Sequence, residues 1–202
     1  MNVYDFDGTI YASDSTVDFF RYCLMRYPGL LRCAPAVLRT GGAYLLQQTS
    51  KTAFKECFFQ FLRYIPHLDN TLHAFWVSHR RGIQPWYLAQ RTPDDVVISA
   101  SPVFLLQPIC IELGITRLIA SRVDPRTGLY TGHNCEKDEK VTRFREMFGN
   151  EPIDAFYSDS LNDMPMACIA KRSFRVQGNR VEPWFVPNPT ALSSALLKTR
   201  RE

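Results

Sequence analysis

The sequence predicts an α/β fold, in which a doubly wound parallel sheet carries one inserted, all-helical segment. Over residues 92–202, short apolar runs rich in β-branched residues alternate with helical patterns, which is typical of a parallel sheet covered by helices. Residues 13–91 show only helical and aromatic-rich patterns. We therefore expect a core domain formed by residues 1–12 and 92–202, and a helical cap domain formed by residues 13–91.

The first predicted strand is short and ends at two acids. An apolar start leads directly into Asp5-Phe6-Asp7-Gly8-Thr9. The chain must turn at Gly8, so both carboxyl groups can reach the carboxyl edge of the sheet. Two acids at one edge repel each other, and a divalent cation is the usual way to stabilise such a pair. The alternative is an acidic turn, because Asp, Gly and Thr are ordinary turn residues.

Five helices are expected in the inserted segment. The first is capped by Ser15 or Thr16 and stopped by Pro28, and the third is capped by Ser50. The expected ranges of the second, fourth and fifth helices are 30–48, 68–80 and 85–90.

Strands and helices alternate after this segment. Strands are expected at 96–99, 117–120, 153–157 and 174–176. Helices are expected at 103–113, at 140–148 and from about residue 162, with a hairpin over 124–130 and a basic, helical tail within 183–202. Pro102 suits the first turn of a helix, and Gly114 and Gly149 suit helix ends.

Further polar residues follow the later strands. Ser99 stands where a strand ends, so its hydroxyl is well placed to donate to a phosphate oxygen, whereas Ser101 before Pro102 is expected to cap a helix. A lysine of the segment 135–141 could neutralise charge at a phosphoryl site, although a lone lysine at a helix start is usually solvated.

The last polar cluster is Ser158-Asp159-Ser160-Leu161-Asn162-Asp163, which follows another strand. A second acid facing the first pair would complete an oxygen-rich Mg²⁺ site. An acidic helix N-terminus is the alternative. Each cluster has such a local explanation, but acids, a serine and a lysine at successive strand ends together favour a ligand site along that edge.

The order of these residues resembles the haloacid dehalogenase-like (HAD) hydrolase superfamily, in particular its phosphoserine-phosphatase-like branch, subfamily IB. The resemblance rests on Asp5–Thr9, on Ile98–Pro102, on the Lys140 region and on the cluster 158–163, and it covers nearly all of the expected core domain. It implies a Rossmann-like core, and it makes the helical insertion that branch's cap domain.

The resemblance also implies a role for each matching residue. Asp5 would be the nucleophile that forms an aspartyl-phosphate, and Asp7 would be the general acid and then the base. Asp5, the backbone carbonyl of Asp7, and Asp159 would bind Mg²⁺. The remaining roles implied are phosphate binding by Ser99, Ala100, Lys140 and Asn162, and a further metal ligand or a neighbour of the ligands at Asp163.

Two assignments stay open at this point. Lys137 aligns as well as Lys140, and we favour Lys140 because Val141 and Phe144 follow it at the spacing of a buried helix face. Asp14 falls near the place where related phosphatases carry an acid that reads the amino group of the substrate. An acid at a helix N-terminus is an equal explanation of Asp14.

The predicted function is therefore that of an Mg²⁺-dependent phosphatase acting on a small phosphomonoester of an amino acid, amino alcohol or sugar. A lipid phosphate such as phosphatidylglycerophosphate is the main rival substrate, because some relatives act on it and the chain has an aromatic cap and a basic tail. A non-catalytic module with this fold is a second alternative, which the presence of Asp5, Asp7 and Asp159 disfavours. A phosphotransferase would use the same residues.

The composition of the chain indicates which partners and which cellular compartment to expect. The chain is 46% hydrophobic and 22% charged, as in ordinary globular proteins, and its net charge of +4 is scattered, so nucleic acid is not expected as a partner. The six cysteines lack the close spacing of a zinc or redox motif, which favours buried thiols in a reducing compartment. With no leader pattern and no apolar run of about 20 residues, we expect a cytoplasmic protein, for which membrane contact is left open but not expected. The oligomeric state stays open.

Overall fold

A computed structural model describes residues 1–186 of the chain. It contains six strands and eight α-helices within that range. The strands are β1 (Asn2–Tyr4), β2 (Val96–Pro102), β3 (Arg117–Ser121), β4 (Ala155–Ser158), β5 (Ser173–Gln177) and β6 (Arg180–Pro183). The helices are α1 (Ser15–Arg26), α2 (Ala34–Leu45), α3 (Lys51–Phe59), α4 (Leu68–His79), α5 (Pro85–Gln90), α6 (Val103–Glu112), α7 (Asp138–Phe148) and α8 (Met164–Ile169). The expected helical tail lies largely outside the described residues.

The six strands form one sheet in the order β3-β2-β1-β4-β5-β6. Strands β1 to β5 are parallel, and β6 pairs with β5 as an antiparallel hairpin. The chain therefore continues from β1 to one side and later returns to its other side, as in doubly wound folds. This arrangement confirms the predicted fold class.

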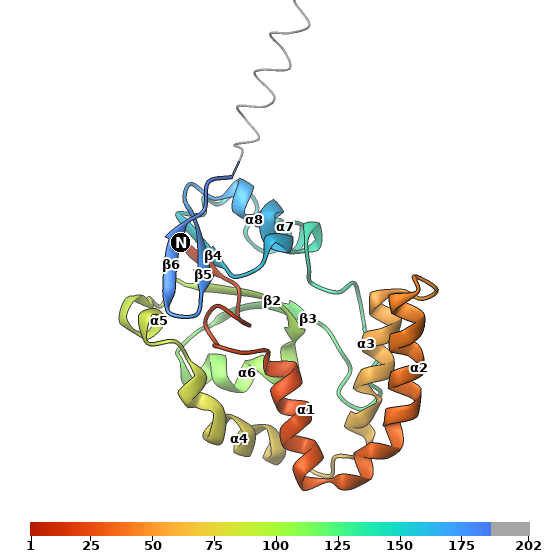
Figure 1. Ribbon diagram of the computed structural model, residues 1–202. Helices are drawn as coiled ribbons and strands as arrows, with labels where there is room; N and C mark the ends of the chain where they lie inside the picture. Colours follow the sequence, from red (N-terminus) through yellow and green to blue (C-terminus); the bar gives the residue numbers. More distant parts are fainter. Residues whose placement is uncertain (187–202) are drawn as a thin grey trace, which may run out of the picture.

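Successive residues of the strands face opposite sides of the sheet, and each side has its own hydrophobic cluster. Val3, Val96 and Phe156 pack with residues of α7 and α8. Tyr4 and Tyr157 belong to the other cluster, which is covered by α4, α5 and α6 (Figure 1). On that side the rings of Tyr4 and Tyr157 stack at 4.7 Å between centroids. The sheet is thus covered on both faces, which explains why its strands read as continuous apolar runs.

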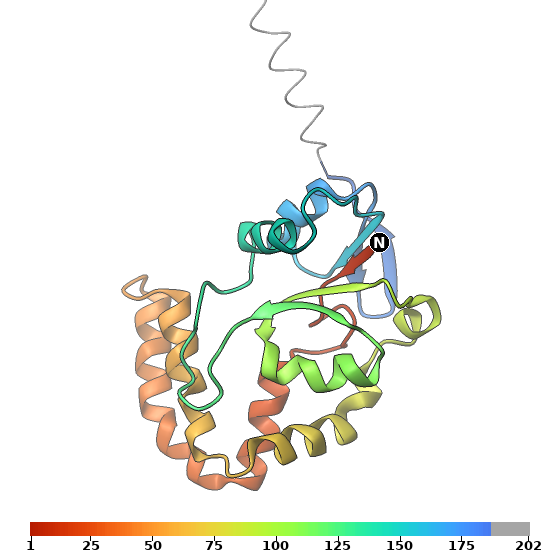
Figure 2. The ribbon, with the colours of Figure 1, turned by 180° about the vertical axis from the view of Figure 1, so that it is seen from behind.

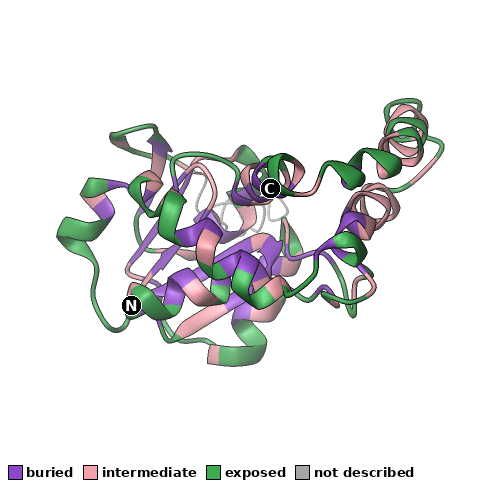
Figure 3. Cartoon of the chain, turned by 90° about the horizontal axis from the view of Figure 1, so that it is seen from below, coloured by how far each residue is buried: buried purple, intermediate pink, exposed green. Residues whose placement is uncertain are grey.

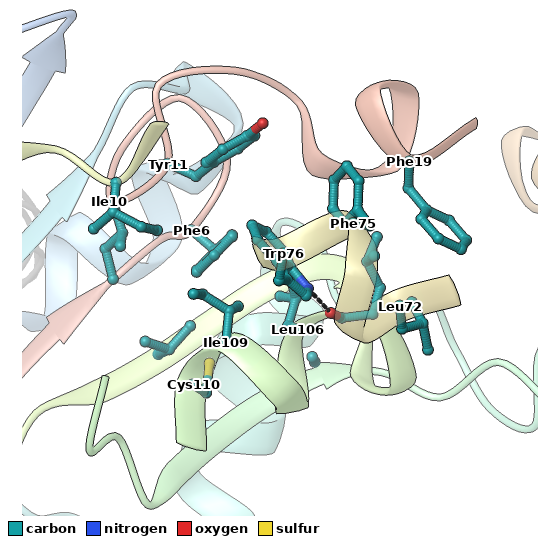
Figure 4. Packing of buried hydrophobic residues seen from close by; sticks show 14 of the residues in the cluster. Phe6, Ile10, Tyr11, Phe19, Leu72, Phe75, Trp76, Leu106, Ile109 and Cys110 are labelled. Atoms are coloured by element: carbon teal, nitrogen blue, oxygen red, sulfur yellow. Dashed lines mark hydrogen bonds between the residues drawn. The ribbon is translucent and has the colours of Figure 1, made fainter. Parts of the chain in front are cut away.

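Part of the helical insertion belongs to this packing. Trp76 of α4 donates from Nε1 to the carbonyl oxygen of Leu105 at 2.7 Å, and its ring meets Phe6 edge-on (Figure 4). Tyr87 of α5 meets Tyr4 edge-on at 5.0 Å. In contrast, α2 and α3 form a hairpin that projects to one side of the molecule (Figure 1). The insertion therefore has one part fixed to the sheet and one part that reaches away from it.

A long loop of the core reaches out to α3. This loop, residues 122–137, joins β3 to α7 and runs along α3 before it returns (Figure 2). The amide of Tyr130 donates to Glu56 at 2.9 Å, and Gln60 donates to the carbonyl of Thr127 at 3.0 Å. The hairpin of α2 and α3 is therefore tied to the core from its inner side.

Most sequence-based elements are confirmed, and the differences have local causes. The α4 and α5 ranges match the predicted ones to within a residue, and Ser50 caps α3 by accepting from Ala53. The expected second helix is instead a 3-10 turn over Pro28–Cys33 followed by α2, because Pro35 marks a new helix start. Strand β6 was not predicted, although Gly178 and the following Asn form the kind of two-residue turn that joins hairpin strands.

Cysteine burial and helix length complete the description. Cys23, Cys110 and Cys135 are buried thiols, as expected. Among residues 1–186, no helix combines the length and the apolar character that crossing a membrane requires.

Candidate active site

The predicted site residues gather beside β1, where the order of the strands in the sheet reverses. β1 lies between β2 and β4, and Asp5 and Asp159 stand just beyond the carboxyl ends of β1 and β4. Ser99 lies within β2, which continues past the predicted strand end at residue 99 to Pro102, with a shift in its pairing to β3 after Ser99. The amide of Asp5 donates to the carbonyl of Tyr157 at 2.9 Å, which continues the ladder past β1. In open α/β sheets, this reversal is where ligands bind.

Lys140 binds the carboxylate of Asp5. Its Nζ lies 2.9 Å from Oδ1 of Asp5 and 2.8 Å from Oδ2 of Asp163, and its side chain is 2% exposed. Burial alone would lower the pKa of Lys140, but the two carboxylates outweigh it and hold the pKa above its ordinary value. Burial also raises the pKa of Asp5, and the Lys140 ammonium opposes that shift. The ammonium thus favours the charged form of Asp5.

The structure also separates the two candidate lysines. Lys140 and Phe144 share the buried face of α7, as their spacing predicts. Lys137 stands just before the helix, with a positive φ of 53°, and its side chain is exposed. Only Lys140 of the pair reaches Asp5.

Asp7 is bound by two groups from other parts of the chain. Its Oδ1 accepts from the amide of Ser15 at 2.7 Å, and its Oδ2 accepts from the hydroxyl of Ser101 at 2.5 Å. Burial raises the pKa of Asp7 to about 6, and the charge of Asp14 adds to the rise. A carboxyl with this pKa exchanges its proton near neutral pH, as a general acid–base group must.

Two of the predictions about helix capping are wrong. Ser101 does not cap a helix, since its hydroxyl is used by Asp7 and also lies 3.1 Å from the hydroxyl of Thr16. The N-cap of α1 is Asp14 rather than Ser15 or Thr16, and Oδ1 of Asp14 accepts from the amide of Val17 at 2.9 Å. Asp caps helices as well as Ser does, so three adjacent candidates could not be ranked from the sequence.

Asp159 lies directly against the turn that follows Asp7. Its amide donates to Oγ1 of Thr9 at 3.0 Å, and Arg175 donates to its carbonyl oxygen at 2.6 Å. Burial, together with repulsion from Asp163, raises the pKa of the Asp159 carboxyl. Gly8 has a φ of 69° and no side chain, which leaves room for this carboxylate.

The other predicted residues line the same site with different contacts. The Ser99 hydroxyl is buried and accepts from the amide of Ser101 at 3.1 Å. Ala100 lines the cavity described below, and so does Asn162, whose amide donates to Oγ of Ser160. Asp163 accepts from Ser158 at 2.7 Å as well as from Lys140. Ser158 belongs to the polar cluster predicted from the sequence, but its contact with Asp163 was not predicted.

A cavity of about 700 Å³ connects these residues with the helical hairpin. Its far side is formed by α3, with Phe54 and Phe58 beside two lysines. Lys51 forms an ion pair with Glu136, and Lys55 donates to Asn134 at 3.2 Å. Burial, aided by repulsion from Lys51, lowers the pKa of Lys55. These lysines were not singled out in the sequence, because nothing local distinguishes them from solvated ones.

Most of the chain matches one protein-family model. Residues 3–167 match the model described as haloacid dehalogenase-like hydrolase. The chain belongs to this family. The resemblance inferred from the motif order is therefore confirmed, and so is the predicted enzyme class, a hydrolase with phosphatases among its relatives.

Several curated relatives of this haloacid dehalogenase-like hydrolase span most of its length. It is 29% identical to Protein CicA of Caulobacter vibrioides over 86% of this chain and 84% of that protein. It is 30% identical to a probable phosphatase of Mycobacterium tuberculosis over 81% of this chain and 63% of the relative. A histidinol-phosphatase of Neisseria meningitidis is 28% identical over 50% of this chain and 47% of the relative.

Solved structures share the fold of this hydrolase. A Bordetella pertussis protein of unknown function superposes with a TM-score of 0.67 and 19% identity over 98% of this chain and 95% of the other. A phosphoserine phosphohydrolase-like protein of Francisella tularensis gives a TM-score of 0.55 and 13% identity over 98% and 100%. At these identities the likeness concerns the fold.

The oxygen groups of the site suit a hard divalent cation. Among residues 1–186, no three His, Cys, Asp or Glu side chains converge as a ready-made metal cluster. The metal ligands implied by the family are instead two carboxylates, those of Asp5 and Asp159, and the backbone carbonyl of Asp7. The pKa of both carboxyls stays raised although Lys140 opposes the shift, because burial and the neighbouring acids outweigh this one ammonium. Oxygen donors with surplus negative charge are what Mg²⁺ prefers.

Proposed function

We propose that this chain is an Mg²⁺-dependent phosphomonoester hydrolase that works through an aspartyl-phosphate on Asp5. The observation that carries the proposal is the contact of Asp5 with the buried Lys140 at the reversal point of the sheet, 2.9 Å apart. An ammonium beside a carboxylate favours the charged, nucleophilic form of that carboxylate, and the same ammonium can bind the phosphoryl oxygens.

The first half-reaction uses Asp5 and Asp7. A carboxylate oxygen of Asp5 forms a bond to phosphorus while the bond from phosphorus to the ester oxygen breaks. Asp7 supplies the proton for the leaving oxygen, and its raised pKa of about 6 keeps a larger fraction of it protonated near neutral pH than an ordinary Asp would have. The hydroxyl of Ser101 and the amide of Ser15 orient the Asp7 carboxyl. The alcohol then leaves, and Asp5 carries the phosphoryl group.

The second half-reaction returns the enzyme to its starting state. Asp7, now a carboxylate, takes a proton from water, and the water oxygen forms a bond to phosphorus. The bond between phosphorus and Asp5 breaks, and phosphate leaves.

Ser99, Ala100, Lys140 and Asn162 hold the phosphoryl oxygens in both steps. Asp163 binds Lys140, and we assign it the task of positioning that ammonium.

Mg²⁺ would be bound by the carboxylates of Asp5 and Asp159 and by the backbone carbonyl of Asp7. When bound, it supplies positive charge to the phosphoryl oxygens and to the crowded carboxylates. Thr9 and Arg175 hold the backbone of Asp159, and the missing side chain at Gly8 gives its carboxylate room. These contacts support a fixed position for Asp159 as a ligand.

We further propose that residues 13–91 act as a cap over residues 1–12 and 92–202. Within it, α4 and α5 pack on the sheet, and the residues that face the cavity come from α3 and from the start of α1. Lys55 lines the cavity from α3 and is half-buried. An ammonium that faces a phosphate site favours a substrate with a second anionic group, such as a carboxylate. Asp14 lines the same cavity and caps α1 through Oδ1, and its reading of a substrate amino group stays a prediction.

The test is release of inorganic phosphate from a panel of soluble phosphomonoesters, with Mg²⁺ and with EDTA. We expect Mg²⁺-dependent release that disappears in Asp5→Asn, and a phosphoenzyme that is trapped by rapid acid quenching in the parent alone. Release that persists in Asp5→Asn would exclude Asp5 as the nucleophile. A folded protein that releases no phosphate from any ester, and forms no phosphoenzyme, would refute the proposal.

A further inference from the structure

The outer side of α2 is apolar although it faces solvent. No residue of α2 is buried (Figure 3). Leu38 and Leu45 are 75% and 81% exposed, and Leu46, just after the helix, is 70% exposed. Leu38 and Leu45 are seven residues apart, so they lie on one face. Exposed leucines in such a row are unusual for a helix of a globular protein and point to a contact surface.

The inner side of α2 is already used. Thr40 donates to Sγ of Cys57, the rings of Tyr44 and Phe54 stack at 5.7 Å, and a Cβ at Gly41 would lie 3.2 Å from Phe54. All three contacts are to α3, which in turn faces the cavity. The outward position of the leucines is therefore set by the packing of α2 on α3.

The segment that carries this face has basic residues and no acid, although its Lys51 and Lys55 line the cavity rather than the outer face of α2. Between Asp18 and Glu56 the sequence contains no acid, but it contains six basic residues. They are Arg21, Arg26, Arg32, Arg39, Lys51 and Lys55. Because the whole chain has a net charge of only +4, the rest of the chain has more acids than Lys and Arg. Positive charge is thus concentrated in the segment that carries the exposed leucines.

We propose that the outer face of α2, defined by Leu38, Leu45 and Leu46 with Arg32 and Arg39 beside it, docks on an anionic lipid membrane. Leucines that enter the interface together with arginines that meet lipid phosphates are the two components of peripheral membrane binding. A second copy of the chain fits this face less well. A symmetric contact would bring the same arginines together, and this segment contains no acid to pair with them.

The experiment is flotation of the full-length chain with vesicles of phosphatidylcholine alone and of phosphatidylcholine with about one third phosphatidylglycerol. We expect binding to the anionic vesicles that decreases with salt, and little binding to the neutral ones. Leu38→Gln/Leu45→Gln and Arg32→Gln/Arg39→Gln should each weaken binding at least about ten-fold. The matched control is Ile111→Gln/Met147→Gln, because these side chains are 69% and 55% exposed on α6 and α7. It should bind as the parent does.

Folding and self-association are measured on the same samples. An unchanged thermal midpoint of each variant shows that a loss of binding is not a loss of fold, and sedimentation velocity reports the oligomeric state. No binding to anionic vesicles overturns the proposal, as does equal weakening by the control variant. A dimer in the parent that dissociates in Leu38→Gln/Leu45→Gln would also overturn it, in favour of a second copy. The assay does not depend on phosphatase activity.

Discussion

The carboxylate of Asp159 fills the space in which a side chain at Gly8 would have to stand. A Cβ at residue 8 would lie 2.3 Å from Oδ2 of Asp159, which is closer than atoms can approach. Thr9 meanwhile accepts from the amide of Asp159. The turn after β1 and the turn after β4 are therefore one packed unit, although 150 residues separate them in the chain.

Gly8→Ala should damage this unit in two ways. The φ of 69° strains any residue with a Cβ, and the added methyl group must displace Asp159. We expect a loss of about 1–3 kcal/mol in the free energy of unfolding and a weaker response of activity to Mg²⁺. Gly149→Ala is the control, since Gly149 has a φ of 62° with open space around it. If both variants lose the same stability and neither changes the Mg²⁺ response, the close approach of Asp159 has no functional role.

Lys140→Met should be more severe than Lys137→Met. Removing the Lys140 ammonium leaves the buried carboxylates of Asp5 and Asp163 without a cation, which costs about 3–5 kcal/mol. Turnover should fall below detection, because Asp5 loses the charge that holds it ionised. Lys137 is exposed, so its variant should unfold in urea like the parent and keep its activity. The reverse pattern, with Lys137 essential, would show that the lysine assignment is wrong.

Asp7→Asn should stabilise the metal-free protein at neutral pH. The pKa of Asp7 is raised from its ordinary value to about 6, so between about pH 4 and 6 the folded state holds this proton more tightly than the unfolded state. The free energy of unfolding of the parent therefore falls as pH rises through this window. With partial solvent exposure allowed for, we expect Asn to gain about 1–2 kcal/mol over Asp at about pH 7.5 in EDTA.

Urea titrations of both proteins across this range measure the effect. The difference between Asp7→Asn and the parent should shrink as pH falls and vanish towards about pH 3, below the ordinary pKa of 3.8, where both the folded and the unfolded parent are largely protonated at residue 7. A difference that does not vary with pH would mean that Asp7 titrates normally in the folded protein.

Lys55→Met should change substrate preference more than basal hydrolysis. We expect kcat/KM for esters that carry a second carboxylate to fall by about ten-fold or more, the effect of losing one charged hydrogen bond. A phosphomonoester with a neutral leaving group should be hydrolysed nearly as before. The control is Lys171→Met, because Lys171 is exposed and lies outside the cavity. An equal decrease for both ester classes would instead assign Lys55 a structural role.

The order of the strands and of the site residues could be read from the sequence because it depends on local patterns. Apolar runs with flanking turn residues identified β2, β3 and β4, and spacing identified α4, α5 and the buried face of α7 that carries Lys140. Asp5, Asp7 and Asp159 were found because each follows a strand or its turn, and Ser99 because the predicted strand ended there, although β2 continues to Pro102. Parallel strands then bring such positions together in any sheet of this kind.

The tertiary structure alone decided which of these groups touch. Ser101 binds Asp7, Lys55 faces the cavity and Glu136 pairs with Lys51, and each of these contacts joins segments that are distant in the chain. The outward face of α2 was decided in the same way, because only its packing on α3 shows which leucines remain in solvent. Hydrophobic periodicity and turn chemistry act over a few residues, so they determine elements and strand ends. The partner of a buried side chain depends on long-range packing, which no local pattern encodes.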